Sequence, residues 1–176
     1  MDEPLSNRIA SCIRSVPNFP KPGIQFKDIT PLLANADLLG ETIRAMTAPF
    51  ANERITHVVG IESRGFLFGV PIAQLLHAAF APARKPGKLP WKTLSEKFAL
   101  EYGIDSLEMH TDALGNAGRV LIVDDVLATG GTLAAACRLV ERIGGSVIGV
   151  SVLAEIPGIR SKSLRIDAPI HSLLHY

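Results

Sequence analysis

The spacing of hydrophobic residues along the chain predicts strands that alternate with helices. Short apolar runs, typical of strands in a parallel sheet, occupy residues 57–61, 79–83, 120–123 and 146–153. Apolar residues at helical spacing predict helices over about residues 3–15, 36–50, 66–77 and 132–143. The second strand is the weakest, because Pro82 interrupts it. This order of elements indicates an α/β fold with a parallel sheet and flanking helices.

Two segments do not follow this alternation. Proline and glycine residues end the first helix and begin a long loop at Pro17. Residues 84–103 are basic, contain proline and show little periodicity, which predicts a mobile hood rather than a core element. We place the whole hood at about residues 84–110 and predict a single domain over residues 1–176.

The stretch Val120–Thr132, with the sequence VLIVDDVLATGGT, combines features that suit a phosphorylated sugar. Its apolar run ends in the carboxylates Asp124 and Asp125, and each can accept hydrogen bonds from two sugar hydroxyls. The glycines of the following turn let backbone N–H groups approach a phosphate closely. The N-terminus of the next helix adds its dipole and its unpaired donors. The stretch therefore predicts an anion site with a polyol site beside it.

Two further polar clusters directly follow predicted strands. They are Glu62-Ser63-Arg64-Gly65 and Arg84-Lys85. Ligands of parallel sheets bind at the carboxyl ends of the strands, so we expect these clusters on the same rim as the aspartate pair. The planar guanidinium of Arg64 matches pyrophosphate oxygens, but the residue taken alone is equally typical of a surface ion pair.

The composition narrows the classes of function. The 176-residue chain is 47% apolar and 20% charged, as expected of one soluble globular domain. A net charge of +1 predicts no broad basic surface for nucleic acid or a membrane, and no apolar run approaches the length of a membrane span. The N-terminal residues lack the apolar region of a signal peptide, and Cys12 and Cys137 form no pair motif. We therefore expect a reducing, cytoplasmic setting.

The acidic pair and its T-G-G-T turn resemble the signature of type I phosphoribosyltransferases. Over almost its whole length the chain further resembles the adenine phosphoribosyltransferases of this group. The matching segments are FPKPGIQFKDITP from Phe19, ESRGF from Glu62, RKPGKLP from Arg84 and LEYG from Leu100. The resemblance implies the type I phosphoribosyltransferase fold, with an N-terminal base-binding segment over about residues 1–34.

The resemblance also implies which residues bind phosphoribosyl pyrophosphate. Asp124 and Asp125 would hold the ribose 2′- and 3′-hydroxyls. The 5′-phosphate would lie in the turn formed by Ala128, Thr129, Gly130, Gly131 and Thr132. The pyrophosphate would be bound by Glu62, Ser63, Arg64, Lys88 and, from the neighbouring subunit, Arg84. Among these, Arg64 and Lys88 would act catalytically by helping the pyrophosphate to leave.

Adenine would be bound mainly by the loop that follows the first helix. Backbone groups of Gln25 and Lys27 would contact the edge of the purine. The ring of Phe26 would stack on one face of the base, and Ile156 would pack on the other. Taken alone, Phe26 is more typical of a buried loop anchor, and Ile156 is simply an apolar residue before a proline.

Glu101 is the proton-transfer residue that the resemblance implies. Closure of the hood would remove water from its carboxyl group and raise its pKa, so that it can exchange a proton near neutral pH. Taken alone, Glu101 is more typical of an exposed loop carboxylate.

These roles together imply that adenine and 5-phosphoribosyl 1-diphosphate react to give AMP and diphosphate, a step of purine salvage. Mg²⁺ is the expected cofactor, held mainly by the substrate and water with no direct protein ligand. A homodimer is expected, because Arg84 would reach the neighbouring subunit. The resemblance further implies a cis peptide bond between Glu62 and Ser63.

Two other functions remain open at this point. One is a phosphoribosyltransferase for a different base, such as xanthine or hypoxanthine. The other is a non-catalytic regulator that keeps the fold and senses phosphoribosyl pyrophosphate. Glu101 and the basic hood argue against the regulator, and the near-neutral charge argues against a form that binds nucleic acid.

Overall fold

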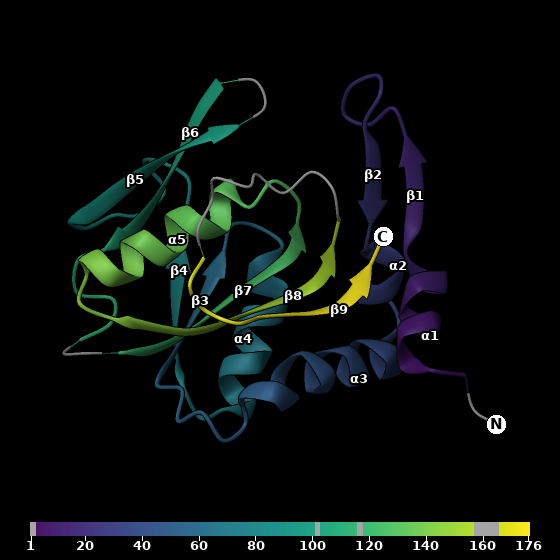
Figure 1. Ribbon diagram of the computed structural model, residues 1–176, viewed down its shortest axis with the longest axis horizontal. Coiled ribbons are helices and arrows are strands. Elements are labelled where there is room, and N and C mark those ends of the chain that lie inside the picture. The colour runs from purple at the N-terminus through teal and green to yellow at the C-terminus, as the bar shows by residue number, and fades with distance from the viewer. Residues whose placement is uncertain (1–2, 101–102, 116–117, 157–165) are drawn as a thin grey trace. The chain divides into compact units, whose positions relative to one another are not determined.

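The computed structural model describes residues 3–100, 103–115, 118–156 and 166–176 (Figure 1). The chain divides into two compact units, Met1–Ala45 and Met46–Tyr176. The larger unit contains the parallel sheet and the smaller unit contains a two-stranded ribbon, so each is described separately. The single domain expected from the sequence stays a prediction.

A five-stranded parallel sheet forms the centre of the larger unit, which confirms the predicted fold class. Its strands, in chain order, are β3 (His57–Ile61), β4 (Ala79–Ala83), β7 (Arg119–Leu127), β8 (Ser146–Glu155) and β9 (Ile170–His175). Their order across the sheet is β4-β3-β7-β8-β9. After β3 the chain forms its neighbour β4 at one edge of the sheet, and it then returns to form β7 on the opposite side of β3. Ligands of open α/β sheets bind beside the carboxyl ends of the strands at such a reversal.

The core of the larger unit lies on both faces of β7. The side chains of Val120, Leu121, Ile122 and Val123 are fully buried, as expected of a central parallel strand. Helices α4 (Gly65–Leu75) and α5 (Gly131–Arg142) follow β3 and β7 and confirm two of the predicted helices. β4 is also confirmed, and it tolerates Pro82 because it lies at the edge of the sheet.

β7 extends beyond its predicted end at Val123 and reaches Leu127. Its pairing with β3 stops at Val123, whereas its pairing with β8 continues to Leu127. Asp124 and Asp125 therefore lie within the strand, at the point where β3 no longer accompanies it.

The hood was predicted wrongly as a segment outside the core. Within the predicted hood, β5 (Thr93–Leu100) pairs antiparallel with β6 (Gly103–His110), and we refer to these two strands as the hairpin. Phe98 is 5% exposed, and Leu107 and Met109 are fully buried in the main hydrophobic core. The alternating pattern of β5 was hidden in the sequence because the charged Glu96 stands between Leu94 and Phe98, where an apolar residue is expected.

The smaller unit begins with α1 (Leu5–Cys12) and continues with β1 (Arg14–Pro17), β2 (Gln25–Asp28) and α2 (Thr30–Leu33). The predicted helix over residues 3–15 was too long, because Arg14–Pro17 pairs with β2 in an antiparallel ribbon. Val16 continues the helical spacing of apolar residues but instead faces Phe26 across this ribbon.

Helix α3 (Ala36–Thr47) runs across the boundary between the two units. The helix predicted over residues 36–50 is confirmed as far as Thr47, and a 3₁₀ turn at Ala48–Phe50 follows it. Pro49 accounts for this change, because it has no N–H to donate and its ring clashes with the preceding helical turn.

Candidate functional site

The turn after β7 carries the geometry of an anion site. Gly130 has a φ of +86°, a left-handed conformation that glycine adopts without steric cost, and it directly precedes α5. The N–H groups of the first helical turn have no partner within the helix and favour a negative charge. A small hollow of about 70 Å³ lies here, lined by Asp124, Val126, Leu127, Ala128, Thr129, Gly130, Thr132 and Leu133. The structure thus places Asp124 beside most of the residues that were predicted to bind phosphate.

The turn after β3 contacts the aspartate pair directly. The Nε atom of Arg64 lies 2.8 Å from Oδ2 of Asp125. A Cβ atom on Gly65 would stand 2.7 Å from the Val123 carbonyl oxygen and 3.1 Å from Oδ1 of Asp124. Only glycine allows α4 to begin this close to β7. Two clusters far apart in the sequence therefore meet at one place on the rim.

The aspartates also interact with each other. The backbone N–H of Asp125 donates a hydrogen bond of 2.9 Å to Oδ1 of Asp124. Burial, together with the neighbouring charge of Asp125, raises the pKa of Asp124 well above its ordinary value. Burial also raises the pKa of Asp125, although the Arg64 guanidinium opposes this shift. A pair of this kind is suited to accept hydrogen bonds from hydroxyls and to face a developing positive charge.

Glu62 organises the basic segment after β4. Its carboxylate accepts hydrogen bonds from Nε and Nη2 of Arg84, at 3.1 and 3.0 Å, and from the backbone N–H of Lys85, at 2.9 Å. Arg84 also donates through Nη1 to the Lys88 carbonyl oxygen at 3.0 Å. The hydrogen bonds from Arg84 are the main reason that the pKa of Glu62 is lowered. The peptide bond between Glu62 and Ser63 is cis, which confirms that expectation.

These contacts separate the roles of the basic residues. Arg84 binds Glu62 of its own chain, and its predicted reach into a neighbouring subunit stays a prediction. The Lys85 ammonium pairs with Asp105 and lies 5.4 Å from the centre of the Phe98 ring. Lys88 is exposed at the surface. The ion pair of Asp105 could not be inferred from sequence spacing, because its partner Lys85 lies 20 positions away.

The predicted adenine-binding residues fall in both units. Gln25, Phe26 and Lys27 lie on β2 of the smaller unit. The half-buried Phe26 ring packs edge-on against Phe19, with 5.1 Å between ring centres, and Lys27 Nζ donates to the Ser15 hydroxyl at 3.0 Å.

Ile156 lies in the larger unit, directly after β8, and its N–H donates to the Leu127 carbonyl oxygen at 2.9 Å. The same strand β7 that carries the aspartate pair therefore also positions the backbone of Ile156. Glu101, the predicted proton-transfer residue, lies outside the described residues.

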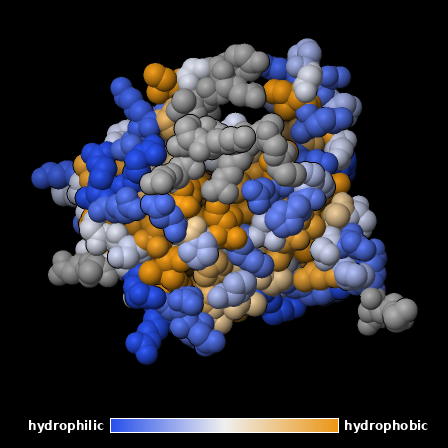
Figure 2. Space-filling view, viewed as in Figure 1, coloured by the Kyte–Doolittle hydropathy of each residue, from blue (hydrophilic) through white to orange (hydrophobic). Residues whose placement is uncertain are grey.

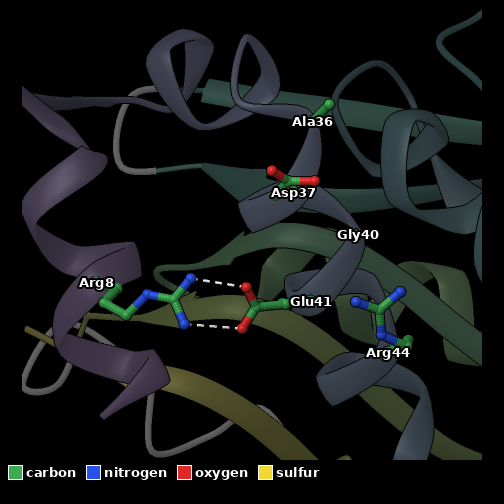
Figure 3. Close-up of a pocket in the computed structure, with 6 residues that line it drawn as sticks. All are labelled: Arg8, Ala36, Asp37, Gly40, Glu41 and Arg44. Atoms are coloured by element: carbon green, nitrogen blue, oxygen red, sulfur yellow. Dashed lines mark hydrogen bonds and ion pairs between the residues drawn. The ribbon is translucent and has the colours of Figure 1, made fainter. Parts of the chain in front are cut away.

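A second hollow, of about 520 Å³, lies in the smaller unit and contains none of the predicted site residues. It is lined by Arg8, Ala36, Asp37, Gly40, Glu41 and Arg44 (Figure 3). Arg8 of α1 donates two hydrogen bonds, of 2.9 and 2.7 Å, to the Glu41 carboxylate of α3. These bonds join two helices. The Arg8–Glu41 ion pair contains none of the predicted site residues, so it can serve as a control for substitutions elsewhere.

Within the described ranges, no three or more His, Cys, Asp and Glu side chains group together as a metal site. The carboxylate oxygens of Asp124 and Asp125 are hard donors at the rim, and they suit Mg²⁺ by their chemistry. No helix in the described part of the chain has the length and apolar character that a membrane span requires.

Comparison with known proteins assigns the class to which this fold and site correspond. The sequence pattern of the phosphoribosyl transferase domain matches residues 26–172, and the chain belongs to this family. An adenine phosphoribosyltransferase of Myxococcus xanthus is 58% identical over 144 residues, which are 82% of this chain and 78% of that protein.

Solved structures agree with this result. The crystal structure of adenine phosphoribosyltransferase from Rhodothermus marinus has a TM-score of 0.93 and 51% identity, and the match covers 98% of both chains. The Saccharomyces cerevisiae adenine phosphoribosyltransferase, solved with an imino-altritol bisphosphate and adenine, has a TM-score of 0.90 and 36% identity over 97% of this chain and 98% of that one. The chain is thus similar to adenine phosphoribosyltransferases along nearly all its length.

Proposed function

We propose that the protein transfers the 5-phosphoribosyl group of phosphoribosyl pyrophosphate to adenine, with AMP and diphosphate as products. The observation that carries the proposal is the cluster at the carboxyl ends of β3 and β7. There Arg64 pairs with Asp125, and Asp124 lines the same hollow as the Gly130 turn. Groups that can donate hydrogen bonds to a phosphate therefore lie beside groups that can accept hydrogen bonds from sugar hydroxyls.

The aspartate pair would bind and orient the ribose. Asp124 and Asp125 accept hydrogen bonds from its 2′- and 3′-hydroxyls. During the reaction, N9 of adenine forms a bond to C1 of ribose while the bond from C1 to the pyrophosphate oxygen breaks, and the electron pair leaves with pyrophosphate. Positive charge develops on the ribose in this step, and the nearby carboxylates stabilise it. Glu101 would take up the proton that the purine loses in this step.

The leaving pyrophosphate would be stabilised from the turn after β3 and from the segment after β4. Arg64 offers a planar guanidinium that binds two phosphate oxygens at once, and Lys88 offers an exposed ammonium. Glu62 holds the backbone of Lys85 and the Arg84 side chain, so it shapes the segment that carries Lys88.

Mg²⁺ would be held mainly by pyrophosphate oxygens, ribose hydroxyls and water, with the carboxylates of Asp124 and Asp125 close to those hydroxyls. When bound, it neutralises part of the charge on the leaving group.

Adenine would be bound by the backbone of Gln25 and Lys27, the ring of Phe26 and the side chain of Ile156. The relative with adenine in its crystal structure supports this base. Backbone groups that pair with the amino group and the adjacent ring nitrogen would be left unpaired by a 6-oxopurine, which penalises hypoxanthine and guanine. We also infer a cytoplasmic homodimer, supported by the composition and by the family resemblance.

The proposal is tested by assaying the purified protein with Mg²⁺, phosphoribosyl pyrophosphate and each of adenine, hypoxanthine, guanine and xanthine. We expect AMP formation with adenine and a much lower kcat/KM for the other bases. Comparable kcat/KM with a 6-oxopurine would assign a different base. Binding of phosphoribosyl pyrophosphate without turnover of any base would instead indicate a regulator.

A further inference from the structure

The inner face of β5 contains one charged residue, Glu96, between the apolar residues Leu94 and Phe98. Leu94, Glu96 and Phe98 alternate along β5 and so share a face, and Glu96 stands opposite Leu107 of β6. Phe98 and Leu107 belong to the buried core, and Leu94 packs against it. Only 19% of the Glu96 side chain is exposed. A carboxylate in such a position is stable only if charged donors satisfy it.

Two arginines of α5, one helical turn apart, provide these donors. Nε of Arg138 donates to Oε1 of Glu96 at 2.6 Å, and Nη1 of Arg142 donates to Oε2 at 2.7 Å. Burial alone would raise the pKa of Glu96, but these hydrogen bonds outweigh it and lower the pKa. We call Glu96, Arg138 and Arg142 the clamp.

The clamp also binds the backbone of β5 on both sides of Glu96. Arg142 Nη1 donates to the Ser95 carbonyl oxygen at 2.9 Å, and Arg138 Nη2 donates to the Lys97 carbonyl oxygen at 3.4 Å. Hydrophilic residues gather over β5 and α5 on the left of the face in Figure 2, where Figure 1 shows the two elements together. Directional bonds to three consecutive residues fix the position of β5 along the helix, which apolar contacts alone do not.

The two elements joined by the clamp adjoin, in the sequence, segments that are proposed to act in the reaction. Helix α5 begins at Gly131, in the turn that was assigned to the 5′-phosphate. Strand β5 ends at Leu100, directly before Glu101 in the sequence. The Arg138 and Arg142 side chains are 41% and 47% exposed, and ion pairs with such exposed partners usually contribute little to stability, so folding alone does not require a carboxylate at this position.

We refer to residues 128–132, which precede and begin α5, as the phosphate turn. We propose that Glu96 is a positioning residue of the transfer reaction, which holds the hairpin in register on α5, the helix that follows this turn. The inference rests on the proposed function. Loss of the clamp lets the hairpin shift against α5 while the phosphate turn and the aspartate pair stay intact. The rate of the chemical step then falls, since small displacements of reacting groups lower rates strongly, whereas binding of phosphoribosyl pyrophosphate changes little.

The first test compares Glu96→Gln with Glu41→Gln, which removes the similar carboxylate of the Arg8 pair in the smaller unit. We expect Glu96→Gln to lower the single-turnover rate about 10- to 100-fold with less than about a 3-fold change in the Kd of phosphoribosyl pyrophosphate. Glu41→Gln should leave both unchanged. An unchanged single-turnover rate in folded Glu96→Gln would overturn the proposal.

A second variant separates positioning from stability. In Glu96→Met/Arg138→Met/Arg142→Met, apolar packing replaces the clamp, and we expect a Tm at or above that of the parent. If Glu96 positions the hairpin, the single-turnover rate of this variant stays low despite its stability. Recovery of the parent rate together with the parent Tm would show that the clamp serves folding only, which contradicts the proposal.

A measurement that does not depend on catalysis distinguishes the proposal for Glu96 from the proposed function. Amide hydrogen exchange of β5 and β6 is measured with and without phosphoribosyl pyrophosphate. We expect the ligand to slow exchange in the hairpin of the parent and to have little effect on it in Glu96→Gln. Equal protection in both proteins would refute the clamp, whereas failure of the parent to use any base refutes only the proposed function.

Discussion

The aspartate pair Asp124 and Asp125 and the single carboxylate Glu96 are all largely buried in the larger unit, but their surroundings shift their pKa values in opposite directions. Burial raises the pKa values of Asp124 and Asp125, and the Arg64 guanidinium only partly opposes this. Two arginines satisfy both oxygens of Glu96, and they lower its pKa in spite of burial.

The difference distinguishes a ligand site from a structural ion pair. Glu96 is already satisfied within the protein, so a ligand would have to displace a guanidinium from it. The aspartate pair instead has a single guanidinium partner, Arg64 at Asp125, and burial disfavours its charged form beside the turn after β7, so hydrogen bonds from sugar hydroxyls would stabilise it. Carboxylates whose pKa values are raised by burial and that line a hollow are candidates for a functional site.

The largest effect is expected from neutralising the aspartate pair. In Asp124→Asn/Asp125→Asn the ribose loses its acceptors, and the developing positive charge loses its counter-charge. Removing one such electrostatic contact typically lowers kcat by about 10²–10³-fold, so we expect a loss of about 10⁴-fold or more for both. Steady-state assays with adenine and phosphoribosyl pyrophosphate measure it, and near-parent turnover in the folded variant would refute the ribose role.

The same variant should not be less stable than the parent at pH 7. A carboxyl group whose pKa is raised on folding binds its proton more tightly in the folded state. Its favourable contribution is therefore full below the unfolded pKa and is lost as the pH rises through the folded pKa. Neutral asparagines remove this unfavourable charge burial, so a Tm equal to or above that of the parent provides the folding control.

The next largest effect concerns Glu101, for which we propose a direct chemical role in proton transfer. Glutamine keeps the size of the side chain but cannot exchange a proton. We expect Glu101→Gln to lower the single-turnover rate about 10²–10⁴-fold while binding of phosphoribosyl pyrophosphate is nearly unchanged. Single-turnover measurement is needed because slow product release can mask the chemical step. An unchanged rate would show that the reaction relies on positioning and leaving-group stabilisation alone.

Gly65→Ala tests how the aspartate pair is held in place. The new Cβ atom would lie 2.7 Å from the Val123 carbonyl oxygen, so the start of α4 must move away from β7. We expect a loss of about 1–3 kcal/mol in the free energy of unfolding and a higher KM for phosphoribosyl pyrophosphate. Denaturant unfolding and steady-state kinetics measure the two effects.

Gly40→Ala is the matched control, because its Cβ atom would meet only the end of the Arg44 side chain, at 3.5 Å. Alanine inside a helix should be neutral or stabilising by up to about 1 kcal/mol. Equal stability changes for the two substitutions would show that the close approach at Gly65 is not required.

The strand, turn and helix around Asp124 and Gly130 could be predicted from the sequence because their requirements are local. An apolar strand, two acids, two glycines and a helix follow each other within a short stretch, and each has its own physical reason. The hairpin could not be predicted in this way. Glu96 breaks the apolar alternation of β5, and the arginines that compensate it lie more than 40 positions away. Only the three-dimensional structure shows that a charged residue there belongs to a core-facing strand.

The end of the first helix was missed for a similar reason. The apolar spacing through Val16 suits a helix, but residues from Arg14 onward pair with a strand that lies beyond the proline-rich loop. Tertiary pairing thus overrides a local pattern. The pairing of Arg64 with Asp125 is also non-local, and the sequence could place both residues on one rim only through the rule for parallel sheets.

The smallest effect, and the one that contrasts the two carboxylate groups most directly, is the pH dependence of stability in Glu96→Gln. The pKa of Glu96 is lowered on folding, so its favourable contribution is present above the unfolded pKa and is lost as the pH falls through the folded pKa. We expect Glu96→Gln to be about 1–2 kcal/mol less stable than the parent at pH 7, since charge-assisted hydrogen bonds are lost. Denaturant unfolding at several pH values should show this difference shrinking below about pH 4, near the ordinary pKa of a glutamate. Asp124→Asn/Asp125→Asn should show the opposite trend. Its stability relative to the parent should fall as the pH falls, because protonation of the buried aspartates stabilises the parent. A stability difference for Glu96→Gln that stays constant down to pH 3 would mean that packing, and not the charge of Glu96, holds the hairpin on α5.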